Sequence, residues 1–175
     1  MQPDLDNLKK RITESRDLVD RLIGKLPGYT GYVEHGEMYE ADRVVRFFLA
    51  ERLAGYKNAV MAAMNEISKR GDLSLLGDVD SLNTVLERAH KKVKYADYIT
   101  SGSFSKMKIT GQDADRILEY DWRMIAAGEE IGPAVDRLSA AAPADVAAVA
   151  KEIKKQIEAF EKSFDDRRNT ILEVI

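Results

Sequence analysis

The sequence predicts an all-α fold, an elongated antiparallel bundle of about five helices with coiled-coil-like heptads. The first observation is a heptad pattern in the C-terminal third. Residues spaced alternately by four and three positions are all apolar, except Arg167. Residues spaced by 3.5 on average stay on one stripe of an α-helix, which must be buried against other helices. Two more observations agree: a second apolar stripe runs through 45–67 with the helical period, and no segment keeps the alternating polarity of a strand. The C-terminal stripe consists of Val146, Ala150, Ile153, Ile157, Phe160, Phe164, Arg167, Ile171 and Val174.

The first helix is predicted over 4–26. Pro3 and Asp4 suit a helix start, and Pro27 with Gly28 forms a stop signal. The segment between them carries a heptad stripe that we expect to face the core. Its apolar members are Leu5, Leu8, Ile12, Val19, Leu22 and Leu26.

The second helix is predicted over 37–69, with a basic last turn and Gly71 as the residue that can adopt a left-handed cap. At a rise of 1.5 Å per residue it would be about 50 Å long, which predicts an elongated bundle. After a connector at 72–78, which includes one turn of helix, we expect a third helix over 80–100.

The fourth helix is predicted to begin near Gln112 and Asp113, where acidic charge suits the helix dipole. Gly132 and Pro133 should kink or end it, because proline lacks the backbone donor and clashes with the preceding turn. Pro143 then occupies a first-turn position at the start of the last helix.

Length and composition narrow the class of protein. The 175 residues fit one domain, 1–175, and the charged fraction of 33 % suits long helices with solvated faces. A net charge of −3 provides no general attraction to nucleic acid, so we expect no nucleic-acid partner. The absence of cysteine excludes disulfides, thiolate catalysis and cysteine-based metal sites, and suits a cytoplasmic location. No stretch resembles a membrane span or a signal peptide, so we expect neither.

Metal chemistry has little support in the sequence. Di-metal carboxylate bundles use two Glu-x-x-His motifs and two further glutamates. The chain has one such motif, Glu87 to His90, and its other histidine, His35, has no glutamate three residues before it. We therefore predict no metal and no cofactor, and keep Glu40, Glu87 and His90 as weak metal-ligand candidates.

The stretch 88–108 is the one local excess of positive charge, with six basic residues and one acidic residue. One interpretation is a surface for an anionic partner, and the other is a solvated helix face that pairs with acidic neighbours. Arg167, the polar gap in the last heptad, sets helix register or marks a partner contact. The candidate partner-binding residues are Lys91, Lys94, Lys106, Lys108 and Arg167.

Two blocks carry a resemblance to a known set of proteins. The stretch Pro27-Gly28-Tyr29-Thr30-Gly31-Tyr32 precedes Glu40-Ala41-Asp42-Arg43 and Leu49-Ala50-Glu51-Arg52-Leu53, and Tyr95-Ala96-Asp97-Tyr98 with Ser101-Gly102-Ser103-Phe104 follows. Over residues 1–130 the chain resembles a poorly characterised set of prokaryotic helical proteins. The resemblance implies a helical fold and no particular activity, and it supplies no catalytic residues.

These observations predict a non-enzymatic helical interaction or scaffold protein that self-associates or docks a helical partner. No nucleophile–base pair is legible, since the chain has two histidines and no cysteine. One alternative is a bundle that binds a metal or small ligand, which includes an enzyme. A second alternative is peripheral contact with an anionic surface through 88–108.

Overall fold

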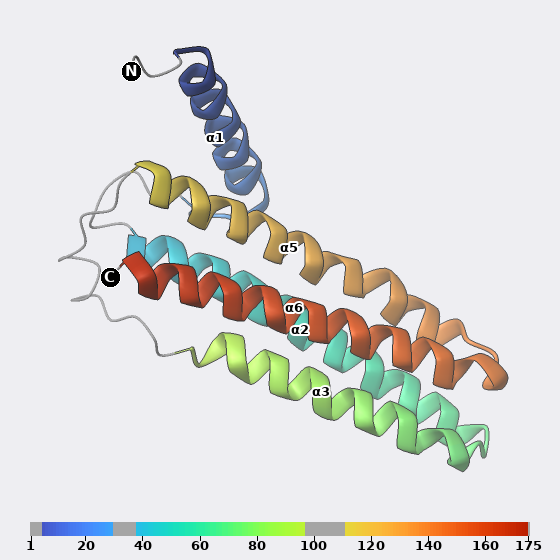
Figure 1. Ribbon diagram of the computed structural model, residues 1–175. Coiled ribbons are helices and arrows are strands. Elements are labelled where there is room, and N and C mark those ends of the chain that lie inside the picture. Colours follow the sequence, from blue (N-terminus) through green and yellow to red (C-terminus); the bar gives the residue numbers. More distant parts are fainter. Residues whose placement is uncertain (1–4, 30–37, 97–110, 175) are drawn as a thin grey trace. The chain divides into compact units, whose positions relative to one another are not determined.

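The chain is all-α, as the sequence predicts. A computed structural model describes residues 5–29, 38–96 and 111–174, and 92 % of them are helical with no strand. Within those ranges lie five α-helices and two single turns of 3₁₀-helix (Figure 1). The helices are α1 (Leu5–Lys25), α2 (Met38–Lys69), α3 (Leu76–Lys94), α5 (Gly111–Ala140) and α6 (Val146–Val174), with η1 (Leu73–Leu75) and η2 (Pro143–Asp145).

The described helices divide into two compact units, and three helices contribute to both. Unit 1 contains α1, α2 as far as Val45, α5 as far as Arg123 and α6 from Asp166. Unit 2 contains the remaining parts of α2, α5 and α6 together with α3. The single-domain organisation expected from the sequence stays a prediction.

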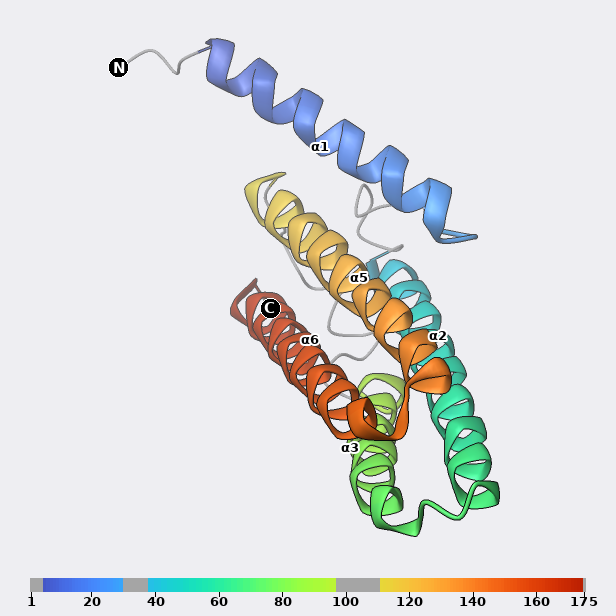
Figure 2. The same cartoon turned by 90° about the vertical axis from the view of Figure 1, so that its right-hand side faces the viewer.

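Unit 2 consists of two helical hairpins, α2–η1–α3 and α5–η2–α6, whose helices lie side by side (Figures 1 and 2). Three polar contacts join α3 to α6, and each links residues that are 73 positions apart. A constant offset means that the two helices run parallel, although each hairpin is antiparallel within itself. The pairs are Ser81 with Lys154, Arg88 with Glu161, and Lys92 with Asp165.

Two glycines allow α5 to pack closely within unit 2. A Cβ atom on Gly128 would lie 3.3 Å from Leu49 Cδ2 and 3.5 Å from the Phe160 ring. A Cβ atom on Gly132 would lie 3.2 Å from the Tyr56 hydroxyl. A side chain at either position would push against a neighbouring helix, so both glycines are explained by the packing of α5.

Pro133 does not end its helix, because α5 continues through it to Ala140. A proline ring normally clashes with the Cβ of the residue before it, and this clash drives that residue out of the helical region of φ/ψ space. Gly132 has no Cβ, and this removes part of that clash. The third helix also differs from expectation: α3 starts at Leu76 and ends at Lys94, and residues 97–110 lie outside the described ranges.

The turns agree with the sequence prediction. Gly71 follows α2 and Gly28 follows α1, both with φ of +84°, the left-handed region in which glycine is favoured. Pro143 opens η2 directly before α6. The C-terminal stripe is buried from Val146 to Ile171, so the heptad faces a core as predicted.

Candidate functional site

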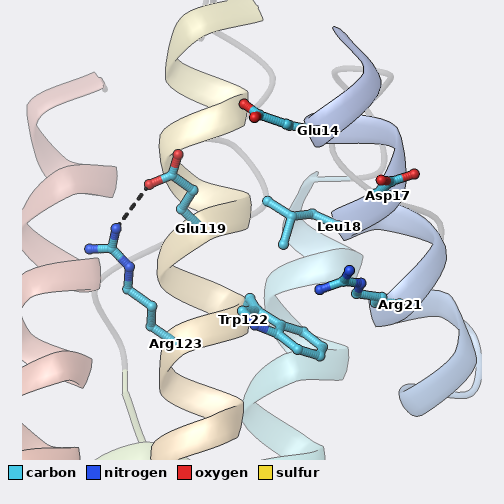
Figure 3. Close-up of a pocket in the computed structure, with 7 residues that line it drawn as sticks. All are labelled: Glu14, Asp17, Leu18, Arg21, Glu119, Trp122 and Arg123. Carbon is cyan, nitrogen blue, oxygen red and sulfur yellow. Dashed lines mark hydrogen bonds and ion pairs between the residues drawn. The ribbon is translucent and has the colours of Figure 1, made fainter. Parts of the chain in front are cut away.

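A groove in unit 1 lies between α1 and α5 (Figure 3). Leu18 and Trp122 are half-buried in it, and five charged side chains surround them. The groove has a volume of about 350 Å³, which suits one or two side chains or a small ligand. The charged residues are Glu14, Asp17, Arg21, Glu119 and Arg123.

Three of the five charged residues of this groove contact another of its lining residues. Arg21 and Lys25 lie over the Trp122 ring, 5.7 and 5.3 Å from its centroid. Arg123 pairs with Glu119 at 3.2 Å, as the dashed line in Figure 3 shows. The residues that line the groove include no serine, threonine, cysteine or histidine. The sequence interpretation missed this groove, because its two walls come from segments about a hundred residues apart.

Elsewhere in unit 1, a buried ion triad joins α2, α5 and α6. Arg167 donates from Nη1 to Asp42 Oδ1 at 2.5 Å and from Nε to Asp121 Oδ1. Arg167 and Asp121 are fully buried, and the Asp42 side chain is 1 % exposed. The Tyr29 hydroxyl also donates to Asp121 Oδ2 at 3.4 Å.

The triad explains the single polar residue in the C-terminal stripe. Because its guanidinium bonds to carboxylates on two other helices, Arg167 fixes the register of α6 against both of them. A fully buried side chain cannot form a surface contact with a partner, so the register interpretation fits the structure and the partner-contact interpretation does not. The sequence alone did not suggest Asp42 as a partner of Arg167. An acidic residue near the start of a helix is already explained by its favourable interaction with the helix dipole.

The described part of the basic stretch is largely paired within unit 2. Arg88 donates two hydrogen bonds to Glu161, at 3.0 and 2.5 Å, and Lys92 donates to Asp165 at 2.6 Å. Lys91 pairs with Glu87 at 3.1 Å, and Lys94 lies 5.5 Å from the centroid of the Tyr95 ring.

These pairings agree with the solvated-face interpretation rather than with a free cationic patch. The remaining candidates of this stretch, Lys106 and Lys108, lie outside the described residues.

Of the weak metal-ligand candidates, Glu87 and His90 are the two whose side chains the structure describes. Glu87 bonds to Lys57 and Lys91, and these two ammonium groups lower the pKa of its carboxyl to about 2. Burial, with help from nearby Lys94, lowers the pKa of His90. Glu40 belongs to α2, and its side chain lies outside the description. Among the described residues, no three histidine or acidic side chains gather where they could hold a metal ion.

The outer face of α2 exposes two large apolar side chains. Phe47 is 67 % exposed and Met61 is 47 % exposed, and exposed Gly55 and Ala62 lie on the same side. Phe47, Ala54 and Met61 are seven residues apart, a spacing that drifts only about 20° around a helix per repeat. The sequence contained this heptad, but the stronger buried stripe at 45–67 concealed it. We call the residues of α2 from Phe47 to Ala62 that face solvent the α2 outer face.

Comparisons with known proteins identify no relative for this chain. No family model matches it, and neither the curated proteins nor the solved structures include a significant match. The resemblance to prokaryotic helical proteins therefore stays a prediction, as does the cytoplasmic location. Within the described ranges, no helix is long and apolar enough to cross a membrane.

Proposed function

We propose that the protein is a non-enzymatic helical interaction protein, and that the α2 outer face is its docking surface for a helical partner or a second copy. The observation that carries this proposal is the exposure of Phe47 and Met61 on one heptad-spaced stripe. Single exposed apolar side chains are ordinary on a protein surface, but two on the same side of one helix favour an interaction site there.

The form of the surface favours a helix as the partner. Apolar pairs recur every seven residues along the face, at Phe47 with Phe48, at Ala54 with Gly55, and at Met61 with Ala62. Apolar residues at a seven-residue spacing keep to one side of a helix, and a second helix can lie along that side. The α1–α5 groove is smaller and already occupied by its own charged side chains, so it supports this function less well.

Site-specific photocrosslinking in cells that naturally express the protein tests this proposal. A benzophenone side chain replaces Phe47 in one variant and Leu73 in the control. Leu73 is 65 % exposed on η1 and lies away from the α2 outer face. We expect one defined protein, which mass spectrometry identifies, to be crosslinked from position 47 and not from position 73. The absence of any specific adduct at position 47 would refute the proposal.

A further inference from the structure

Among the described residues, none packs against Gly55. It lies in the interior of the 32-residue helix α2, where glycine is unfavourable for a helix. The interior glycines of α5 each face a neighbouring side chain, but a Cβ atom on Gly55 would meet nothing within 4 Å. Gly24 and Gly77 also meet nothing, but they lie in the last turn of α1 and the first turn of α3. Close approach of another backbone from outside would account for a bare glycine at this position.

The sizes of the side chains along the α2 outer face are complementary about Gly55. Bulky Phe47 and Phe48 lie one heptad before Ala54 and Gly55, and Met61 and small Ala62 lie one heptad after them. Two copies of this face in antiparallel orientation would place Phe48 of one copy over Ala62 of the other. The centre of that arrangement would be glycine against glycine, where two helices can approach most closely.

The charges select the antiparallel orientation. Exposed Glu51 and exposed Arg52 lie between the first apolar pair, Phe47 and Phe48, and the second, Ala54 and Gly55. A parallel pair would set each of them opposite the same residue of the other copy, which is a repulsive arrangement. An antiparallel pair centred at Ala54 and Gly55 places Glu51 opposite neutral Asn58 instead of opposite another Glu51. The face as a whole carries no net charge, so a second copy is not repelled.

We propose that a second copy of this chain occupies the α2 outer face, in an antiparallel α2–α2 pair with Ala54 and Gly55 at the two-fold axis. This inference rests on the proposed function and adds the identity and orientation of the partner. An isologous pair of this kind closes on itself, because each copy uses the same face for the same contact.

Single-cysteine variants test the orientation, and the chain has no cysteine of its own to interfere. Gly55→Cys places its thiol beside the axis, so it should form a disulfide-linked dimer under mild oxidation. Phe48→Cys alone should remain monomeric on a non-reducing gel, but an equimolar mixture with Ala62→Cys should form the mixed dimer. Ala159→Cys, exposed on α6, is the matched control and should not crosslink.

Sedimentation velocity tests the association itself with the unlabelled protein. The wild type should show a concentration-dependent dimer, and Phe47→Glu should raise the dissociation constant roughly tenfold or more. Because Phe47 is mostly exposed, this variant should keep its helical circular dichroism.

Three outcomes would overturn the inference, and they differ in what they mean for the proposed function. Disulfide formation by Phe48→Cys alone would show a parallel pair, and would leave the docking surface intact. If the wild type is monomeric and position 47 is photocrosslinked to a different helical protein, then that protein, and not a second copy, occupies the α2 outer face. A monomeric wild type that floats with phosphatidylcholine vesicles, when Phe47→Glu does not, would assign the face to lipid and refute both proposals.

Discussion

Replacing Arg167 by methionine should destabilise the protein far more than any surface ion-pair mutation. Methionine retains much of the arginine stem but removes the guanidinium that Asp42 and Asp121 share. All three side chains are at most 1 % exposed, so water cannot replace the lost bonds. Removing one partner of a buried ion pair costs about 3–5 kcal/mol. For a chain of this length each kcal/mol lowers Tm by about 2–4 °C, so the expected loss is roughly 6–20 °C.

The assay is urea unfolding at pH 7, followed by circular dichroism, with a thermal scan alongside. The control is Arg116→Met, which removes the same charge from an exposed pair in unit 1, 3.5 Å from Glu173. An exposed pair contributes about 0–1 kcal/mol, so the control should change stability by no more than that. Equal stability losses in the two variants would refute the assignment of Arg167 to a desolvated triad.

A triple variant separates stability from register. Replacing Arg167 by methionine together with Asp42→Leu and Asp121→Leu removes every charge of the triad. Hydrophobic replacement of a buried ionic cluster is often neutral, or stabilising by about 1–4 kcal/mol. Recovery of stability by the triple variant would show that the triad contributes little net stability.

Three further predictions concern unit 2. Phe160→Ala should cost about 3–5 kcal/mol in urea unfolding, because the ring is fully buried, and a loss below 1 kcal/mol would contradict this. The hydrogen bonds from Lys57 and Lys91 together lower the pKa of Glu87 from 4.5 to about 2, so these pairings stabilise the fold above pH 4.5 and are lost as pH falls towards 2. Lys57→Met should therefore raise that pKa in an NMR titration, whereas an unchanged value would assign the shift to other groups. Gln156→Leu should be neutral or stabilising, because Gln156 Oε1 is buried without a hydrogen-bond partner, and a clear loss of stability would reveal an unseen partner.

Local periodicity was enough to predict that the chain is helical and which face of the last helix is buried. The stripe from Val146 to Ile171 is buried, and Pro143 begins the final helical segment as expected. Gly132 and Pro133 were expected to kink or end the helix, and the ending is wrong because α5 continues to Ala140. The rule that proline ends a helix neglects the missing Cβ of the residue before it.

Partners across the fold could not be predicted from the sequence. Arg167 was recognisable as an exception in its stripe, but the choice of Asp42 and Asp121 among thirty acidic residues depends on how helices meet. The basic residues Arg88 and Lys92 likewise find their acidic partners 73 positions away. A count of charges within 88–108 therefore overstates the positive charge of this surface, because it leaves out acidic residues that are distant in sequence but adjacent in the fold.

The constant offset between α3 and α6 has a consequence for the order of folding. Within the hairpins, Arg137 meets Glu152 across 15 positions, whereas the contacts between hairpins span 73. Closing the longer loop costs roughly 1.4 kcal/mol more in chain entropy, so each hairpin should form before the two dock. Pulse-labelled hydrogen exchange should then detect protected amides around the Pro143 turn before the α3–α6 seam is ordered. Simultaneous protection of both regions would instead indicate that the hairpins form only as they dock.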